Sequence, residues 1–387
     1  MILREELYRQ RMDIMMKTIN HEEPDRVPVF ALTGTWGISY YGTTVRECLK
    51  DREWYAKEVA SKIYKDMNCD IIMSAGTMNN FEFDEIVGGG TQFISEDGVT
   101  IQHKEGIGIN VEDYPKMIKD PWNFFITEFI PRTHPDITIE KMAQAVKSLK
   151  KGFDGMAWIP EYYKKEFGLI YLMSGGGYVY PPLDMLFDYL RGFKGTLTDI
   201  RRSPQLVLEA VEALYPLAEA GVPISDTDRN LDPFPFPMTM LHSPTYLSTK
   251  QFEKFFAPTY ERLLKKIHAA GKKVFVYLEG EWKQHYDWLN SLPKDFLIGI
   301  VEKDDIIEMK KKVGDNITLV GGMPLNVLKF ENKEYCIDYA KRIVDACAPG
   351  GGFIFGTDKV LQCPGDVNPD NYIAVNNYVC EYGGYSK

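Results

Sequence analysis

Short apolar runs alternate with amphipathic stretches along the 387-residue chain. Each run is rich in β-branched or aromatic residues, which is typical of parallel strands covered on both faces. The predicted strands are Val27–Leu32, Asp70–Ala75, Leu169–Ser174, Val222–Asp226, Lys273–Glu279, Phe296–Glu302, Ile317–Gly321 and Gly352–Gly356. The predicted helices between them include Leu206–Ala220, Lys250–Ala270, Asp304–Val313 and Glu334–Cys347. This alternation predicts an α/β fold, a (β/α)8 TIM barrel rather than an open doubly wound sheet.

One block interrupts the alternation. Glu85–Ile109 combines a GGG stretch and an EDG turn with alternating polar and apolar residues. This pattern predicts an inserted β-hairpin or three-stranded meander. Residues 1–20 have a helical pattern and predict an N-terminal helical extension. Because the chain shows no internal repeat, low-complexity tract or linker, we expect one domain over residues 1–387, with an insertion at about residues 85–165.

Charge and cysteine content exclude several classes of protein. The chain has 45 Lys and Arg against 55 Asp and Glu, a net charge of −10, and no basic run. Such a surface argues against nucleic acid and anionic membranes as partners. No segment approaches the length of a membrane span, and the N-terminus lacks the apolar run of a signal peptide. Six cysteines without a CxxC pair predict a reduced, cytoplasmic protein.

In a barrel of this kind, chemistry belongs at the carboxyl ends of the strands. The sequence YLEGEW places Glu279 and Glu281 just past the fifth predicted strand, where carboxylates act as general acids or bases or as metal ligands. Glu279 could instead cap the following helix. His242 follows a proline-rich loop, either as a site residue or as an ordinary capping or packed histidine. Asp226 and Asp228 end the fourth predicted strand, so one of them can face the barrel mouth.

Two further groups of residues lie on the predicted loops at this end. Cys363 is the only cysteine there, although a lone cysteine is usually buried and inert. With His242 and Glu279 it could supply three zinc ligands and leave the fourth position open. Aromatic side chains on the same loops could line a substrate pocket or simply pack at the barrel rim. They are Trp36, Tyr40, Tyr178, Tyr180, Phe234 and Phe236.

Several segments together carry a family resemblance. They are MMKTINHEEPDRVPVF (Met15–Phe30), SPTYLSTKQFEKFFAPTYERLL (Ser243–Leu264), VFVYLEGEWKQHYDWLNSLP (Val274–Pro293), GDNITLVGGMPLNVL (Gly314–Leu328) and GGFIFGTD…NPDNYIAV (Gly351–Val375). In this order they resemble the uroporphyrinogen decarboxylase superfamily, which contains decarboxylases and corrinoid-linked methyltransferases. The resemblance implies a (β/α)8 barrel, in agreement with the strand pattern.

Local motifs separate the branches of that superfamily. The true decarboxylase has an arginine-rich R-Q-A-G-R segment after the first strand, whereas Leu32–Gly37 contains no arginine. A substrate with many carboxylates needs guanidinium partners, so the chain departs from that activity. The branch that uses methyl-coenzyme M has H-x-C-G where this chain has Tyr277–Gly280, and Tyr is a poor zinc ligand. Glu279–Trp282 (EGEW) resembles instead the substrate-side methyltransferases of anaerobic O-demethylases.

This resemblance implies methyl transfer from a small methylated substrate, an aryl methyl ether, to the cob(I)alamin of a corrinoid protein. That protein is separate, because the chain has no D-x-H-x-x-G corrinoid-binding segment. In this hypothesis the three predicted ligands hold zinc, while Tyr277 and the acidic residues named above orient or protonate the ether oxygen. A decarboxylase of a smaller acid and a non-catalytic binder remain as alternatives. The methyl donor stays open between an ether, an amine and a thiol, and a barrel of this size is compatible with a homodimer.

Overall fold

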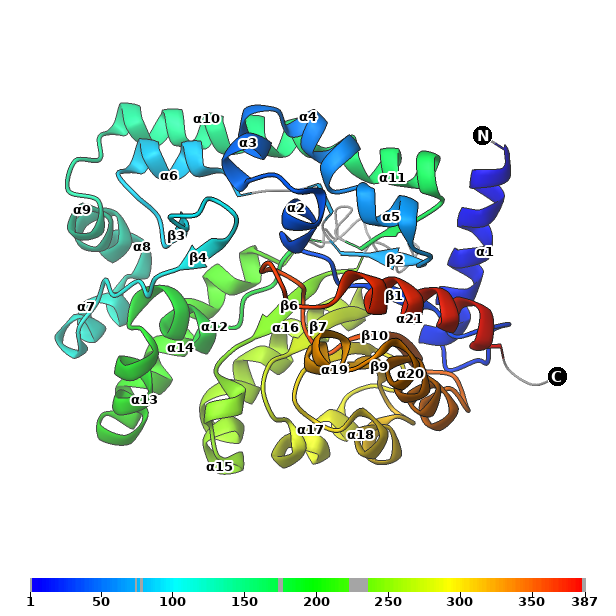
Figure 1. The fold of residues 1–387 in the computed structure, drawn as a ribbon. Coiled ribbons are helices and arrows are strands. Elements are labelled where there is room, and N and C mark those ends of the chain that lie inside the picture. Colours follow the sequence, from blue (N-terminus) through cyan, green and yellow to red (C-terminus); the bar gives the residue numbers. More distant parts are fainter. Residues whose placement is uncertain (1, 74, 77–78, 173–176, 223–235, 385–387) are drawn as a thin grey trace.

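The computed structural model describes residues 2–73, 75–76, 79–172, 177–222 and 236–384. Its centre is an eight-stranded parallel sheet in the order β5-β2-β1-β10-β9-β8-β7-β6 (Figure 1). Beyond this order, Tyr178, which follows β5, forms a parallel bridge with Met238 of β6, and Val179 N–H donates to Met238 O at 2.8 Å. The sheet therefore closes into the predicted (β/α)8 barrel. The strands are β1 Val29–Ala31, β2 Ile71–Ile72, β5 Ile170–Tyr171, β6 Met238–Leu241, β7 Val274–Leu278, β8 Leu297–Val301, β9 Thr318–Met323 and β10 Phe353–Thr357.

Two layers of apolar side chains stabilise the barrel. The inner layer fills the barrel itself, with Phe30, Phe275, Ile298 and Ile354 among its fully buried members. The larger outer layer lies between the strands and the surrounding helices. Because successive residues of a strand point alternately into these two layers, both are apolar, and each strand is one continuous apolar run in the sequence.

The helices around the barrel follow the predicted pattern closely. The predicted helix Lys250–Ala270 is observed as α15 Thr249–Gln251, a π-helical turn η6 Phe252–Phe256, and α16 Ala257–Ala269. Ser248 begins it with a capping box, in which its hydroxyl accepts from Gln251 N–H. The other barrel helices are α2 Trp36–Tyr41, α3 Val45–Lys50, α4 Arg52–Trp54, α5 Lys62–Asp66, α12 Pro182–Met185, α13 Phe193–Arg202, α14 Pro204–Ala220, α17 Tyr286–Ser291, α18 Ile306–Val313, α19 Leu325–Phe330, α20 Lys333–Cys347 and α21 Pro369–Tyr382.

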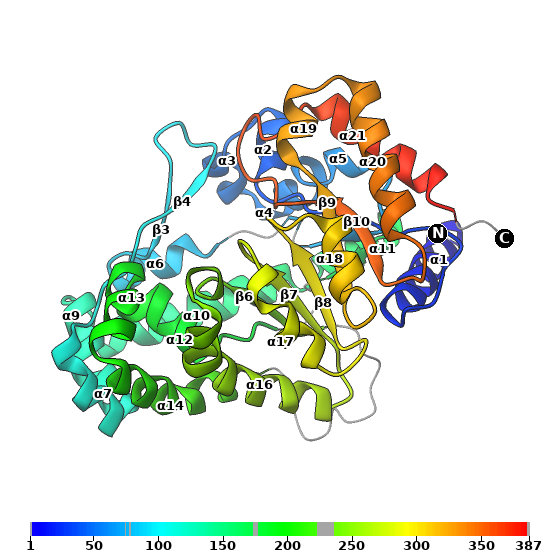
Figure 2. The ribbon, with the colours of Figure 1, turned by 90° about the horizontal axis from the view of Figure 1, so that it is seen from below.

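The insertion after β2 contains the predicted hairpin. Strand β3, Gln92–Ile94, pairs antiparallel with β4, Ile101–His103. Figure 2 shows the insertion extending to one side of the barrel. No helix in the described part of the chain is long and apolar enough to cross a bilayer, and all six cysteines are free. The helices of the insertion are α6 Phe81–Val87, α7 Tyr114–Lys119, α8 Pro121–Phe124, α9 Ile130–Thr133, α10 Ile139–Met156 and α11 Ile159–Phe167.

The amino end of the barrel is covered by helix α1, Ile2–Ile19, whose apolar side chains join the inner layer. Asp70, just before β2, is fully buried there. Its carboxylate accepts hydrogen bonds from Arg26 Nη1 at 2.7 Å, from Arg11 Nε at 3.1 Å and from Val29 N–H at 2.8 Å. Two guanidinium groups therefore neutralise one buried carboxylate, and this network ties α1 and β1 to β2.

The fourth strand of the barrel differs from the predicted one. Residues 223–226 of the predicted strand Val222–Asp226 lie outside the described residues, and Val222 lies in a turn after α14. The fourth place in the barrel is taken by β6, which pairs with β7 along its whole length. Its sequence, MTML, is short, has one β-branched residue and follows a proline-rich segment, so it lacks the usual strand signal.

Candidate active site

His242 is the first residue after β6, so its ring lies at the carboxyl end of the barrel. Its Nδ1 lies 2.8 Å from Asp188 Oδ2, and its Nε2 lies 3.4 Å from Glu279 Oε2. Burial lowers the pKa of His242, but the hydrogen bond and charge of Asp188, with the charges of Asp184 and Glu279, outweigh it and raise the pKa to about 9. The structure therefore holds this imidazole as a cation at neutral pH.

The histidine belongs to a longer chain of polar contacts. Asp188 lies on a π-helical turn, η4 Leu186–Leu190, and its Oδ2 also accepts a hydrogen bond from Tyr180 OH at 2.9 Å. Burial and the charge of Asp188 raise the pKa of Tyr180, so this hydroxyl stays protonated and donates. Tyr180, Asp188, His242 and Glu279 therefore form one connected set, the His242 chain.

A second aspartate, Asp184, fixes the backbone that carries His242. Asp184 of α12 is fully buried, and its carboxylate accepts hydrogen bonds from the N–H groups of His242 and Ser243, at 3.2 and 3.0 Å. Burial and the nearby charge of Asp188 raise the pKa of Asp184 to about 7. The two aspartates lie one helical turn apart, so one holds the peptide after β6 and the other holds the ring of His242.

More carboxylates follow strands β8 and β10. Glu302, directly after β8, accepts from Gly280 N–H at 2.7 Å and lies 3.4 Å from Lys359 Nζ. Asp358, directly after β10, accepts from Leu325 N–H at 3.1 Å, and burial raises its pKa to about 6. Burial also raises the pKa of Glu279, an effect that His242 opposes and Glu302 reinforces. Among the described residues, the barrel mouth therefore collects more carboxyl groups than the cations beside them neutralise.

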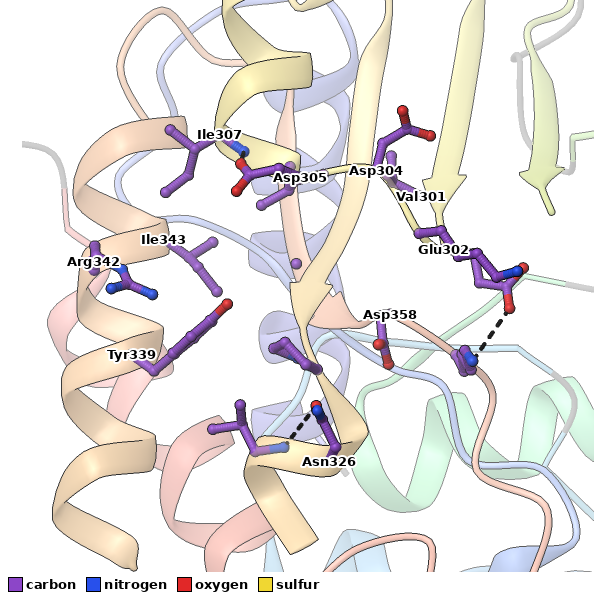
Figure 3. Close-up of a pocket in the computed structure, with 16 residues that line it drawn as sticks. Val301, Glu302, Asp304, Asp305, Ile307, Asn326, Tyr339, Arg342, Ile343 and Asp358 are labelled. Carbon is purple, nitrogen blue, oxygen red and sulfur yellow. Dashed lines mark hydrogen bonds and ion pairs between the residues drawn. The ribbon is translucent and has the colours of Figure 1, made fainter. Parts of the chain in front are cut away.

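A cavity of about 670 Å³ opens beside these residues (Figure 3). Its lining includes Glu302, Asp358 and Lys359, which follow β8 and β10, and Tyr339 and Arg342 of α20. Figure 3 shows Tyr339 and Arg342 across the cavity from Glu302 and Asp358. Its volume lies in the range of small-ligand sites. This cavity shares Glu302 and Asp358 with the barrel mouth and is large enough for part of a substrate.

Of the predicted catalytic residues that the structure describes, one lies at the barrel mouth and one lies at the surface. Tyr277 lies on β7 against the inner apolar layer, and burial, with the charges of Glu302 and Glu279, raises its pKa. Glu281 is exposed, and its backbone N–H donates to Thr245 Oγ1. Asp226 and Asp228 lie outside the described residues. The structure therefore brings Tyr277 to the mouth and turns Glu281 toward solvent, because successive residues after a strand point in different directions.

The predicted aromatic pocket is assembled only in part. Tyr178 and Tyr180 meet at the mouth with ring centroids 5.7 Å apart. Phe236 is buried in the inner layer, and Phe234 lies outside the described residues.

Two of the aromatics predicted to bind substrate lie elsewhere. Trp36 is buried in the outer layer, where it stacks on Tyr40 at 5.0 Å and meets the ring of Tyr372 edge-on at 5.9 Å. Tyr40 OH donates to Asp66 of α5. Helix α2 thus uses these rings to pack against α21 and α5 rather than to line the mouth, because packing buries the apolar face of this short helix.

The three predicted zinc ligands do not form a metal site in this arrangement. Cys363 is exposed on the loop after β10, its N–H bonds to Asp366, and burial of the sulfur raises the pKa of its thiol. His242 and Glu279 do lie together, with Nε2 3.4 Å from Oε2. Within the described ranges, no three His, Cys, Asp or Glu side chains are grouped to hold a metal ion. Zinc therefore stays a prediction of the sequence, and the described residues bring two of its three predicted ligands together.

Sequence reasoning missed most partners of His242. Asp184 and Asp188, in PPLDMLFDYL, carried a usable signal, because two acids one helical turn apart follow the loop after a strand. Glu302 and Asp358 stand at predicted strand ends, where their sequence context does not distinguish them from capping residues. Lys359 had no signal of its own, since its ion pair with Glu302 depends on β10 and β8 lying on either side of β9 in the sheet.

A closed (β/α)8 barrel with titratable groups gathered at its carboxyl end has the architecture of a barrel enzyme. Residues 238–382 match the family model for uroporphyrinogen decarboxylase (URO-D), in agreement with the resemblance of the sequence segments that lie within them.

Comparison with solved structures gives the same fold. A methyltransferase from Methanosarcina mazei is similar with a TM-score of 0.58 and 12% identity, over 95% of this chain and 97% of that chain. A B12-independent methionine synthase from Shewanella sp. W3-18-1 aligns with a TM-score of 0.39 and 10% identity, over 92% and 96% of the two chains. No curated protein sequence matches the chain significantly. The first similarity confirms the barrel fold.

Proposed function

We propose that the chain transfers a methyl group from an aryl methyl ether to the cob(I)alamin of a separate corrinoid protein. The observation that carries the proposal is the His242 chain, which holds an imidazolium at the barrel mouth between two carboxylates. The EGEW sequence supports the corrinoid-linked branch. Methyl transfer in general is supported by the shared fold with a methyltransferase from Methanosarcina mazei.

His242 supplies the proton that ether cleavage needs. The methyl group leaves without its bonding electrons, so the ether oxygen keeps the electron pair and must be protonated. Phenols have a pKa near 10, and an imidazolium with a pKa of about 9 is well matched to that oxygen. Nε2 is the donor, because Nδ1 is held by Asp188. The partner's reduced corrinoid supplies the electron pair that accepts the methyl group, and His242 regains its proton from solvent.

The neighbouring residues orient this donor and its substrate. Asp188 fixes the ring and stabilises its positive charge, and Asp184 fixes the peptide that carries it. Tyr178 and Tyr180 offer an aromatic wall against which the aryl ring can pack. The cavity beside Lys359 gives room for ring substituents. A zinc ion, if bound, would act as a Lewis acid at the ether oxygen, but no step above depends on it.

A second candidate is the decarboxylation of a small carboxylic acid, which the URO-D family match favours. The negative charge of the described carboxyl groups at the barrel mouth disfavours the binding of an acid. Lys359 is already paired with Glu302, and the remaining groups beside His242 are mostly carboxylic acids. An anionic substrate would meet repulsion there unless His242 alone offset it.

The test is a methyl-transfer assay with the full chain. Veratrole and guaiacol, which are uncharged, are offered with free cob(I)alamin as the acceptor, and both the loss of cob(I)alamin absorbance and the phenol product are measured. We expect stoichiometric phenol, with the rate falling about 100-fold or more in His242→Gln. Glu334→Gln, on the exposed start of α20, is the matched control and should retain the rate.

The other outcomes separate the alternatives. Release of CO2 without a corrinoid would favour the decarboxylase. Transfer from methylamines or methanethiol but from no ether would keep methyl transfer and replace the donor class. No transfer from any donor would contradict the proposal.

A further inference from the structure

His285 is buried in the loop after β7, where the proposed function leaves it without a role. It ends a short 3-10 helical turn, η7 Lys283–His285, and is 1% exposed. Its ring stacks on Phe252 with centroids 4.1 Å apart and meets the ring of Trp282 edge-on at 5.5 Å. These contacts explain an aromatic residue at this position, but they do not explain a polar one.

The imidazole of His285 keeps one of its nitrogens unpaired. Nε2 lies 3.2 Å from Pro244 O, and because a carbonyl oxygen only accepts, Nε2 carries the hydrogen and donates. Burial lowers the pKa of His285, so the ring is neutral and its Nδ1 can only accept. Among the described residues, this Nδ1 is buried and has no hydrogen-bond partner. An unpaired buried nitrogen costs free energy that a phenylalanine ring would not cost, so packing alone would favour the hydrocarbon.

The hydrogen bond of His285 reaches the backbone that carries His242. Pro244 begins the 3-10 turn η5 Pro244–Tyr246, two residues past His242. From the side of β5, Asp184 holds this backbone by accepting from the N–H of His242, and His285 holds it from the side of β7. Pro244 O also accepts from Leu247 N–H at 3.1 Å, so it would keep a partner without His285. The bond from His285 is therefore not needed to pair this carbonyl, and its effect is to fix where the turn lies.

A second contact links the same two loops. The N–H of Glu281 donates to Thr245 Oγ1 at 3.2 Å. Gly280 has a left-handed backbone (φ 74°), and a Cβ added there would collide with Thr245, so the loops approach too closely for a side chain. These loops carry His242 and Glu279, whose Nε2 and Oε2 atoms lie 3.4 Å apart. The contact between His242 and Glu279 therefore depends on how the two loops are held together.

We propose that His285 is a positioning residue, which fixes the turn after β6 through Pro244 and thereby holds Nε2 of His242 opposite Glu279 at the barrel mouth. Because His285 is buried, it touches no substrate itself. The proposal rests on the proposed function in one respect, that His242 is the group that acts on the substrate. It explains why a histidine with an unpaired nitrogen occupies a position that an aromatic hydrocarbon would fill.

Two substitutions separate positioning from packing, because each keeps one half of what His285 does. His285→Phe keeps the ring and removes the donor, so the melting temperature should stay at or above that of the wild-type chain. In the methyl-transfer assay its kcat should fall about tenfold or more with KM nearly unchanged. His285→Gln returns an N–H near the place of Nε2 but loses the stacked ring, so kcat should recover to within about threefold while the melting temperature falls. His268→Phe and His268→Gln, at the exposed end of α16, are matched controls and should change neither quantity.

Amide hydrogen exchange of the full chain tests the same contact without a substrate. Residues 242–249 should exchange several-fold faster in His285→Phe than in the wild-type chain, and at the wild-type rate in His268→Phe. If the wild-type chain transferred no methyl group, the proposed function would fail, and the exchange rates would still decide whether His285 holds the turn after β6.

Three results would overturn the proposal. The kcat of folded His285→Phe could equal that of the wild-type chain. Both variants could lose turnover and melting temperature together, as expected for a residue that only packs. Exchange of residues 242–249 could be unchanged in His285→Phe, which would show that Asp184 holds the turn without help from His285.

Discussion

The two ends of the barrel differ in how well their buried carboxylates are neutralised. At the amino end, buried Asp70 receives hydrogen bonds from two arginines and one backbone N–H. At the carboxyl end, the described carboxyl groups share one histidine and two exposed lysines, and the pKa values of Asp184, Glu279 and Asp358 are raised by burial. The same side-chain chemistry is neutralised at one end and left in excess at the other.

This difference separates stability from chemistry. A carboxylate surrounded by guanidinium groups fixes the chain segments around it. Carboxyl groups that compete for one imidazole hold it protonated and keep protons within reach of a substrate. We therefore expect substitutions at the amino end to alter unfolding and substitutions at the carboxyl end to alter turnover.

The largest effect should come from Asp70→Ala. The change leaves two guanidinium groups without their carboxylate, one of them on Arg11, which is buried. We expect a loss of about 3–5 kcal/mol in the free energy of unfolding, measured by urea titration, with the turnover of the folded fraction unchanged. Asp154→Ala, an exposed acid on α10, is the control and should cost under about 1 kcal/mol. A small loss in Asp70→Ala would contradict the stabilising role of the amino end.

His242→Gln should lower turnover and leave the free energy of unfolding nearly unchanged, the reverse of Asp70→Ala. The amide cannot carry the proton, so turnover should fall about 100-fold or more, which corresponds to roughly 3 kcal/mol of transition-state stabilisation. The free energy of unfolding should change by no more than about 1 kcal/mol, because the ring is partly exposed and its carboxylate neighbours gain an amide donor. If stability fell as much as in Asp70→Ala, the contrast between the two ends would fail.

Asp358→Asn should change how stability depends on pH. Because burial raises the pKa of Asp358 to about 6 in the folded chain, its contribution to stability is complete below the unfolded pKa of about 4 and is lost as the pH rises through 6. The variant should therefore be more stable than the wild-type chain at pH 7, by about 2–3 kcal/mol at most, and equal to it at pH 4. Asparagine can still accept from Leu325 N–H, so that hydrogen bond is kept.

Urea titrations at several pH values measure this effect. Asp338→Asn, on the exposed side of α20, is the matched control and should show no such difference between pH 4 and pH 7. An Asp358→Asn variant with the wild-type pH dependence would show that the carboxyl end is as well neutralised as the amino end.

The smallest effect should be the amount of zinc that the purified chain binds. Because Cys363 is exposed and the described residues contain no group of three possible ligands, we expect the purified chain to hold well below one zinc ion per chain. Elemental analysis before and after dialysis against a chelator measures this. A full equivalent of zinc that disappears in Glu279→Ala would instead establish the site that the sequence predicted.

Most of the secondary structure follows from local patterns in the sequence. The strand runs, the helix Lys250–Ala270 and the hairpin within Glu85–Ile109 follow from burial patterns and turn residues that a short window contains. The sequence also indicated that His242 and Glu279 belong to one site, because both follow neighbouring strands of the barrel.

Tertiary structure alone decided the rest. It placed the weakly patterned β6 as the fourth strand, and it packed Trp36 into the outer layer instead of the mouth. It brought Asp188 to His242 across 54 positions of the chain. Local patterns report which residues are buried, whereas the protonation of a histidine depends on which distant carboxylates reach it, and only the closure of the barrel determines that.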